Sequence, residues 1–367
     1  MTDLLRVKRL TAQLLAAPAD SVLTVAAHFG AMQGQDLGAV LWALGQRARS
    51  SGKPATVTTV RDSFNRGEVV RGWPMRGTLH AVPAADLGWM LSLTTERLMR
   101  GAASRRAGLG LDEQTLDRAR SLAIDLLGGG HGATRAEFLE HLERNGISTE
   151  SSRGYHIIWS LSQTGVLCWG PFRAAEQELR LMDEWITNPT VLDRDDALCE
   201  FFSRYINGHG PATLSDFAAW TGLTMGDCRT AVRLATERGR VHPFLHNNES
   251  YFVAELTEPG IETTGPRLIP LAGFDEYYLG YRARDAVIHP DHAQRVVPGN
   301  NGMFKPVLLQ DGVAIGTWKR KATSRGLLIE VSPFEPMPKR QLQHDLELVF
   351  QPFADFWETP LRSVTTE

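Results

Sequence analysis

The sequence predicts an α+β protein in which repeated helical units precede a β-rich C-terminal part. Helix-start signals and short strand pairs alternate up to about residue 262, whereas short apolar strands dominate from residue 263 onward. The chain of 367 residues exceeds the size of one compact core, so we expect roughly two to four domains.

The first unit is expected over residues 1–125. Helical patterns cover residues 3–16, 19–32, 37–48 and 55–66. Two strand-like segments follow at residues 69–71 and 78–82, with a turn expected near Trp73-Pro74.

The second unit is expected over residues 126–192. Thr134 and Glu137 form a capping-box pattern that starts a helix, and Asn145-Gly146 ends it. A second helix covers residues 155–161, and a strand at 166–169 ends at a turn expected at Gly170-Pro171. Helix, turn, helix and strand in this order indicate a winged helix.

The same order returns about 80 residues later, in a third unit expected over residues 193–262. Thr213 and Thr224 are placed to cap two helices, and a strand pair follows with its tip at Asn247-Asn248. The sequence therefore predicts three tandem winged-helix units. Such units bind duplex DNA, although some bind other proteins instead.

Residues 263–367 are expected to form a small β-barrel-like unit. Strand-like segments lie at residues 268–271, 307–309, 313–318 and 327–331, and Asp311-Gly312 reads as a hairpin turn. An amphipathic helix expected at residues 338–357 closes the chain.

Composition favours a cytoplasmic protein, associated with the nucleoid when bound to DNA. Hydrophobic residues make up 43% and charged residues 22%, and no apolar run is long enough to span a bilayer. Cys168, Cys199 and Cys228 are too widely spaced for a zinc site and are expected to be buried thiols. The net charge of −3 does not favour nucleic-acid binding by itself, but basic residues cluster at 97–106 and 319–325.

The segment Met32-Gln33-Gly34-Gln35-Asp36-Leu37 is the most distinctive motif. In an extended backbone, Gln33 and Gln35 would face the same side, and their uncharged amides could orient a water molecule. Asp36 could assist as a base or counter-charge, but it also fits the N-cap of a helix that begins at Leu37, which we prefer. The whole segment could also be an ordinary solvated helix end.

Three blocks carry a resemblance to a known family. RGWPMRGTLH (71–80), GFDEYYLGY (273–281) and PGNNG (298–302) resemble the tandem winged-helix DNA glycosylases related to AlkZ and YcaQ. The likeness covers nearly the whole chain. It implies three winged-helix units and a β-barrel-like unit arranged as a C, whose basic concave face binds duplex DNA.

The resemblance also implies an activity, namely excision of N7-alkylated purines, including unhooking of interstrand crosslinks. The catalytic signature of the family is Gln, an aliphatic residue, then Gln or Asp. It falls on Gln33 and Gln35, with Gly34 in place of the aliphatic residue. Alkylation at N7 gives the purine a positive charge, so the base leaves as a neutral molecule and no general acid is needed.

Further residues are candidates for contact with the lesion or the DNA. His80 could support catalysis, or it could be a core histidine. Phosphate contacts are expected from Arg71, Arg76, Arg229 and Arg233, and groove contacts from a basic hairpin that comprises Trp318, Lys319, Arg320 and Lys321. Asp275 and Glu276 could contact DNA, but we prefer a structural network.

No cofactor and no catalytic metal are expected, because the histidines lack ligand spacing. The expected partner is double-stranded DNA that carries alkylated purines, with no membrane or obligate protein partner. Two functions remain open: a monofunctional DNA glycosylase, and a non-catalytic winged-helix protein that acts as a transcriptional regulator or a lesion binder.

Overall fold

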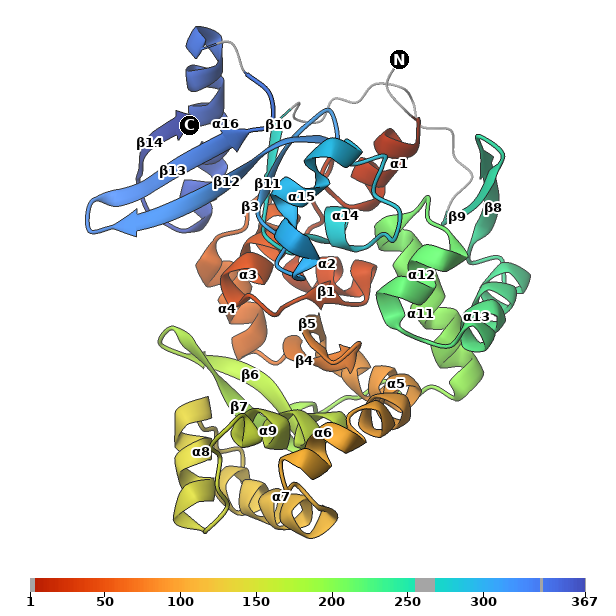
Figure 1. Cartoon of the computed structure of the whole chain (residues 1–367), viewed down its shortest axis with the longest axis vertical. Coiled ribbons are helices and arrows are strands. Elements are labelled where there is room, and N and C mark those ends of the chain that lie inside the picture. The colour runs from red at the N-terminus through yellow and green to blue at the C-terminus, as the bar shows by residue number, and fades with distance from the viewer. Residues whose placement is uncertain (1–3, 255–267, 337–338, 367) are drawn as a thin grey trace.

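The computed structural model describes residues 4–254, 268–336 and 339–366, and for Asn300 and residues 339–344 the backbone alone. The domain boundary expected at residues 262–263 lies outside these ranges. Within them, no helix combines the length and apolar character that a membrane span requires. Figure 1 shows the N-terminal helices at the centre of the molecule, with the other parts around them.

The N-terminal part contains four helices and a β-hairpin, as expected. The helices are α1 (Leu4–Ala12), α2 (Val22–Phe29), α3 (Leu37–Gln46) and α4 (Val57–Asn65), and the hairpin strands are β4 (Val69–Met75) and β5 (Thr78–Pro83). A two-residue strand, β1 (Met32–Gln33), pairs antiparallel with β5. A small ladder joins β2 (Arg49–Ser50) and β3 (Lys53–Pro54).

The turn expected near Trp73-Pro74 is wrong. β4 continues through Pro74, and the chain reverses at Arg76 and Gly77, whose φ angles are 54° and 72°. The pairing of β4 with β5 shifts register between Gly72 and Met75. An irregularity of this kind accommodates proline, which cannot donate a hydrogen bond to the ladder.

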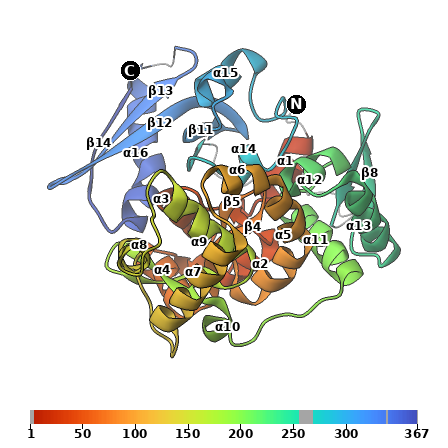
Figure 2. The same ribbon diagram turned by 60° about the horizontal axis from the view of Figure 1, so that its bottom comes forward.

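The next part begins with α5 (Leu87–Gly101) and α6 (Ala103–Gly108). It continues with α7 (Glu113–Leu127), α8 (Arg135–Arg144), α9 (Arg153–Gln163) and the hairpin of β6 (Leu167–Arg173) and β7 (Glu176–Leu181). The capping box of Thr134 and Glu137 is confirmed. In Figure 2 the α7–α9 part lies in front of the central helices.

The turn expected at Gly170-Pro171 is also wrong. β6 runs through this pair with a register shift between Trp169 and Phe172. Because β4 also pairs with β6, the two hairpins form one sheet in the order β1-β5-β4-β6-β7. The first two parts of the chain are therefore joined by backbone hydrogen bonds.

A short helix, α10 (Met182–Trp185), leads to the third part. It contains α11 (Arg194–His209), α12 (Leu214–Thr221), α13 (Met225–Glu237) and the hairpin of β8 (His242–His246) and β9 (Glu249–Val253). Thr213 and Thr224 cap α12 and α13 as expected. Apolar side chains of α11 share one core with those of α5, which fixes this part against the second.

The C-terminal part is an open sheet and not the expected barrel-like unit. Its strands are β10 (Leu268–Leu271), β11 (Val307–Gln310), β12 (Val313–Thr323), β13 (Gly326–Pro333) and β14 (Leu361–Thr366), paired in that order. In the described part of the chain, β10 and β14 are the edge strands of this sheet. The apolar face of the sheet is covered by α16 (Lys339–Phe356). Two short helices, α14 (Glu276–Leu279) and α15 (Ala293–Val296), follow β10.

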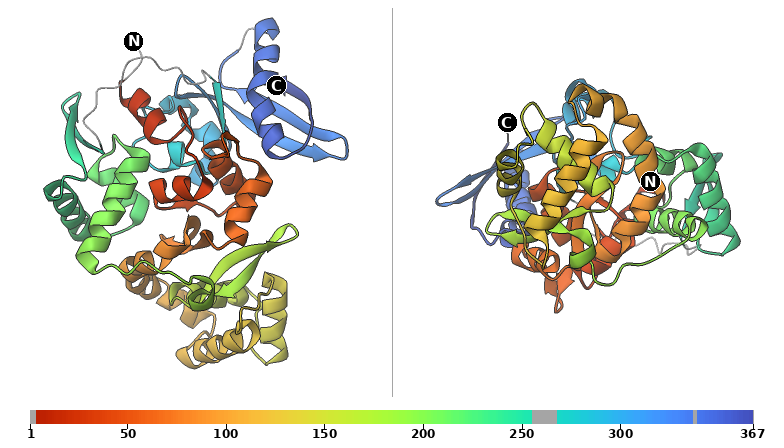
Figure 3. Two further views of the ribbon diagram at one scale, coloured as in Figure 1. Left: turned by 180° about the vertical axis from the view of Figure 1, so that it is seen from behind. Right: turned by 90° about the horizontal axis from the view of Figure 1, so that it is seen from below.

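Trp318 on β12, Phe353 on α16 and Trp42 on α3 belong to one core. This core joins the C-terminal sheet to the N-terminal helices, so α3 is held against β12. The β12–β13 hairpin extends beyond the core, and Figure 3 shows it projecting from the body of the molecule in both views.

Candidate active site

The Gln33-Gly34-Gln35 motif lies in the connection between α2 and α3. α2 ends at Gly30, where φ is 75°, and the chain then forms β1. Gln33 lies opposite His80 in the ladder, and the backbone nitrogen of Gly34 donates to Leu79 O at 2.7 Å. The motif is therefore extended and attached to β5.

The two amides have different surroundings. The Gln33 side chain is buried, with the residue only 8% exposed, and its Oε1 accepts a hydrogen bond from the backbone nitrogen of Gln35 at 2.7 Å. Gln35 is exposed, and its Oε1 accepts from the backbone nitrogen of Leu79 at 3.3 Å. Gln33 thus holds the backbone of Gln35, while Gln35 itself lies at the surface.

Asp36 is the N-cap of α3, as expected. Its Oδ1 accepts from the backbone nitrogen of Ala39 at 3.0 Å, yet the residue is exposed. Capping uses one carboxylate oxygen, so an exposed Asp36 can still orient water beside Gln35.

Arg71 does not lie on the surface, contrary to its expected role at a phosphate. It is buried beside the motif, where Nη1 donates to Gly34 O at 3.1 Å, and burial lowers the pKa of Arg71 to about 10. A Cβ on Gly34 would lie 3.2 Å from Arg71 Cδ. Arg71 therefore occupies the space that an aliphatic side chain at position 34 would need.

His80 is a core histidine and does not reach the surface. Its Nδ1 donates to Thr78 O at 2.9 Å, which leaves Nε2 to accept from Arg76 at 3.4 Å. Burial, with the nearby charge of Arg76, lowers the pKa of His80 to about 3. The ring is therefore neutral at physiological pH and supports the strand opposite Gln33.

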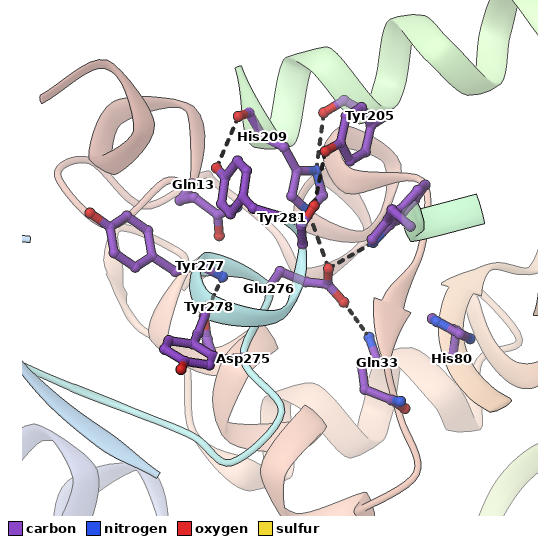
Figure 4. Close-up of polar contacts among 12 residues, drawn as sticks. Gln13, Gln33, His80, Tyr205, His209, Asp275, Glu276, Tyr277, Tyr278 and Tyr281 are labelled. Atoms are coloured by element: carbon purple, nitrogen blue, oxygen red, sulfur yellow. Dashed lines mark hydrogen bonds and ion pairs between the residues drawn. The ribbon is translucent and has the colours of Figure 1, made fainter. Parts of the chain in front are cut away.

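Glu276 contacts the motif from the other side, as Figure 4 shows. Its Oε1 accepts from the backbone nitrogen of Gln33 at 2.7 Å, and its Oε2 accepts from Trp220 Nε1 at 2.9 Å and His209 Nε2 at 3.1 Å. Burial alone would raise the pKa of Glu276, but the hydrogen bond and charge of His209 outweigh it and lower the pKa to about 2. The carboxylate is therefore ionised.

Asp275 forms a buried ion pair with Arg47, with Oδ1 2.7 Å from Nη2 and Oδ2 3.0 Å from Nη1. The structural roles preferred for Asp275 and Glu276 are thus supported by their contacts. The contact between Glu276 and Gln33 has no signal in the sequence, because it joins residues 243 positions apart.

The expected DNA-contacting residues are partly exposed. Arg229 and Arg233 are exposed on α13, where Arg233 pairs with Glu237 at 2.7 Å, and Arg76 is half-buried. Lys319, Arg320 and Lys321 are exposed on β12, and Lys319 forms an ion pair with Glu330.

Trp318 requires a correction, because it is only 5% exposed. Its Nε1 donates to Leu271 O at 2.9 Å, and its ring packs against Phe350 and Phe353. The strand enters the core at this residue, whereas residues 319–321 lie on the projecting part of the hairpin.

A cavity of about 290 Å³ lies directly beside the motif, between the start of α3 and the C-terminal sheet. It is lined by Asp36 and Gly38, by Arg320 and by aromatic side chains, among them Phe274, Phe304 and Trp357. The Arg320 guanidinium lies 4.2 Å from the centre of the Trp357 ring. No pattern in the sequence predicts this cavity, because segments that are distant in the chain form it.

Within the described ranges, no group of three or more His, Cys, Asp or Glu residues is placed to hold a metal ion.

Comparisons with known proteins identify the family of the chain. The chain is 28% identical over 342 residues to the interstrand DNA cross-link repair glycosylase of Streptomyces sahachiroi, covering 84% of this chain and 80% of that protein. The solved structure of Streptomyces sahachiroi DNA glycosylase AlkZ has the same fold, with a TM-score of 0.74, 22% identity and 98% of each chain covered. The family model described as DNA glycosylase AlkZ-like matches residues 26–356, and the chain therefore belongs to the AlkZ-like DNA glycosylase family.

Proposed function

We propose that the protein is a monofunctional DNA glycosylase that hydrolyses the N-glycosidic bond of N7-alkylated purines in duplex DNA, including purines tied in interstrand crosslinks. Family membership and the name of the Streptomyces relative support the reaction and the crosslink. The observation that carries the assignment is that Gln35 and Asp36 are both exposed. They follow closely after the buried Gln33, whose backbone is held by β5 and by Glu276.

The proposed chemistry uses an amide and a carboxylate. An N7-alkylated purine leaves as a neutral base, so the site has to stabilise the positive charge that develops on the sugar and place a water molecule. Asp36 supplies negative charge, and Gln35 orients the water. Gln33 acts on the backbone of Gln35, with its Oε1 2.7 Å from the Gln35 nitrogen.

The proposed DNA-binding surface combines three winged-helix units and the basic hairpin around a concave face. Each of the antiparallel hairpins β4–β5, β6–β7 and β8–β9 follows two or more helices of its own unit. We assign the units to residues 1–125, 126–192 and 193–262, with the C-terminal part at 263–367. Arg229 and Arg233 on α13, and Lys319 to Lys321 on β12, contact phosphates and grooves.

The cavity beside Asp36 is proposed to receive the substituent on N7. Asp36, the residue after Gln35, lines this cavity. A substituent on a purine that lies beside Gln35 would therefore extend into it. A crosslinked base cannot leave the duplex completely, and room beside the motif removes the need for a closed base pocket.

The test uses duplex DNA with 7-methylguanine and, separately, DNA with a nitrogen-mustard crosslink. Base release is followed as alkaline strand cleavage at the abasic site, and DNA affinity is measured by fluorescence anisotropy. Gln35→Ala should abolish release with little change in affinity. Asp36→Asn preserves the N-cap, since asparagine caps as well as aspartate, and should isolate the loss of negative charge. A wild-type protein that binds both DNAs but releases neither base would instead be a non-catalytic DNA-binding protein.

A further inference from the structure

We infer that Glu276 is a positioning residue for the reaction, which couples the strand that carries Gln33 to helices α11 and α12. This inference rests on the proposed function of the Gln33–Asp36 segment. The role is more specific than general support of the fold, because Glu276 binds the backbone of the motif itself.

β1 is an edge strand, which leaves one of its backbone groups to be satisfied from outside the sheet. Among the residues that the structure describes, the sheet ends at β1, which pairs with β5 alone. In an antiparallel pair, successive N–H groups point to opposite sides, so the Gln33 N–H points away from β5 when the Gly34 N–H bonds to Leu79. The Glu276 carboxylate accepts it at 2.7 Å, where a further strand would otherwise lie.

The other oxygen of this carboxylate is held by the third part of the chain. Trp220 on α12 and His209 at the end of α11 both donate to Oε2. His209 Nδ1 faces Tyr205 O at 3.0 Å, so both ring nitrogens face acceptors. A carboxylate buried in this way is stable only while all its donors remain in place, because an ionised group without partners is costly to bury.

The short helix α14, which begins at Glu276, and the residues directly after it pack closely against His209. A Cβ on Gly280 would lie 2.3 Å from His209 Cδ2, and the Tyr281 hydroxyl donates to His209 O at 2.9 Å. The distance between Glu276 and α11 is therefore fixed by packing as well as by the hydrogen bond.

A continuous set of hydrogen bonds runs from here to the exposed amide. His209 and Trp220 hold Glu276, Glu276 holds the Gln33 nitrogen, and Gln33 Oε1 holds the Gln35 nitrogen. Glu276 is 1% exposed and cannot itself reach the sugar. Its effect on the reaction comes through the position of Gln35, and displacement of a reacting group by about 1 Å can lower a rate on the order of 100-fold.

The direct variant is Glu276→Gln, which keeps the shape of the side chain but places an NH₂ group against either the Gln33 N–H or the donors of His209 and Trp220. Trp220→Phe is the second variant, because it removes one donor and leaves a smaller aromatic ring in the buried position. It preserves the test if Glu276→Gln fails to fold.

Asp86→Asn is the matched control. Asp86 is a buried carboxylate that accepts from Trp89 Nε1 at 3.0 Å and pairs with Arg204, but it joins α5 to α11. It therefore has the same chemistry as Glu276 without a contact to β1.

Three quantities are measured: hydrogen exchange of peptides covering residues 30–37, the single-turnover rate of 7-methylguanine release at saturating enzyme, and DNA affinity. Glu276→Gln and Trp220→Phe should speed exchange in these peptides, and Glu276→Gln should lower the rate roughly tenfold or more. Affinity should stay within about twofold, because phosphate contacts are unchanged. Asp86→Asn should change neither the exchange of residues 32–37 nor the rate. Gly30 is left out of this comparison because the side chain of Arg204, the partner of Asp86, packs beside it.

A folded Glu276→Gln protein with wild-type rate, or with wild-type exchange at residues 30–37, would overturn the inference. The same holds if Trp220→Phe leaves both quantities unchanged. If wild-type protein releases no base from any adduct, the proposed function fails. Exchange still decides separately whether Glu276 anchors the strand, since that measurement needs no substrate.

Discussion

Replacing Gly34 by valine tests the close packing around the motif. A Cβ at this position would lie 3.2 Å from both Arg71 Cδ and the Ala81 nitrogen, and 3.3 Å from the His80 carbonyl carbon. Two of these neighbours are backbone atoms of β5 and cannot rotate away. Overpacking of this kind lowers the free energy of unfolding by about 1–3 kcal/mol.

Displacement of Arg71 adds to this effect. Its hydrogen bond to Gly34 O would be weakened, and a bond from a charged donor contributes about 1.5–3 kcal/mol. Replacing glycine also reduces the conformational entropy of the unfolded chain, which raises the free energy of unfolding by only about 0.5–1 kcal/mol. We therefore expect Gly34→Val to lower the free energy of unfolding by about 2–4 kcal/mol, and Gly34→Ala by less.

A double-mutant cycle with Arg71→Met isolates the proposed cause. Methionine is slimmer and flexible, so Gly34→Val should be better tolerated in the Arg71→Met background, with a coupling of about 1 kcal/mol or more. Urea unfolding followed by tryptophan fluorescence measures all four proteins. A stable Gly34→Val single variant, or strictly additive effects, would refute the view that Arg71 fills the place of the aliphatic residue.

Three further predictions concern the cavity, the hairpin and His80. Gly38→Leu should narrow the cavity, since a Cβ there would lie 3.1 Å from Arg320 Nη2. It should slow excision of crosslinked purines more than excision of 7-methylguanine. Equal slowing of both reactions would argue against the cavity as a binding site. Lys321→Ala should weaken DNA binding for all sequences and reduce the slope of log affinity against log salt by about one, whereas an unchanged slope would exclude a phosphate contact. Because the pKa of His80 falls from 6.5 to about 3 on folding, the unfolded chain binds a proton below pH 6.5 that the folded protein does not. Stability should therefore fall as the pH drops from 6.5 toward 3, by up to about 1.4 kcal/mol per pH unit from this residue, and urea unfolding of His80→Gln should show a shallower pH dependence.

The sequence by itself predicts the features that depend on neighbouring residues. Thr134, Thr213 and Thr224 cap helices as expected, and the Asp311-Gly312 and Asn247-Asn248 turns connect strands. These features follow from local hydrogen bonds and from the φ angles that each residue type tolerates. The two incorrect turns, at Trp73-Pro74 and Gly170-Pro171, are also informative. A proline after an apolar run suggests a turn, but Pro74 and Pro171 both lie within strands, at register shifts. Local sequence does not distinguish such a strand irregularity from a turn.

Only the tertiary structure decided which side chains of the candidate site are exposed and which are buried. Gln35 and Asp36 are exposed, but Gln33 is turned inward, and Arg71 and Trp318 are buried despite a sequence context that suggested DNA contacts. Glu276 reaches the motif from 243 residues away. The physical reason is that the burial and partners of a polar group are set by the segments packed against it, and these segments are distant in the chain. A sequence pattern specifies the chemistry of each side chain, while packing determines where that chemistry is available.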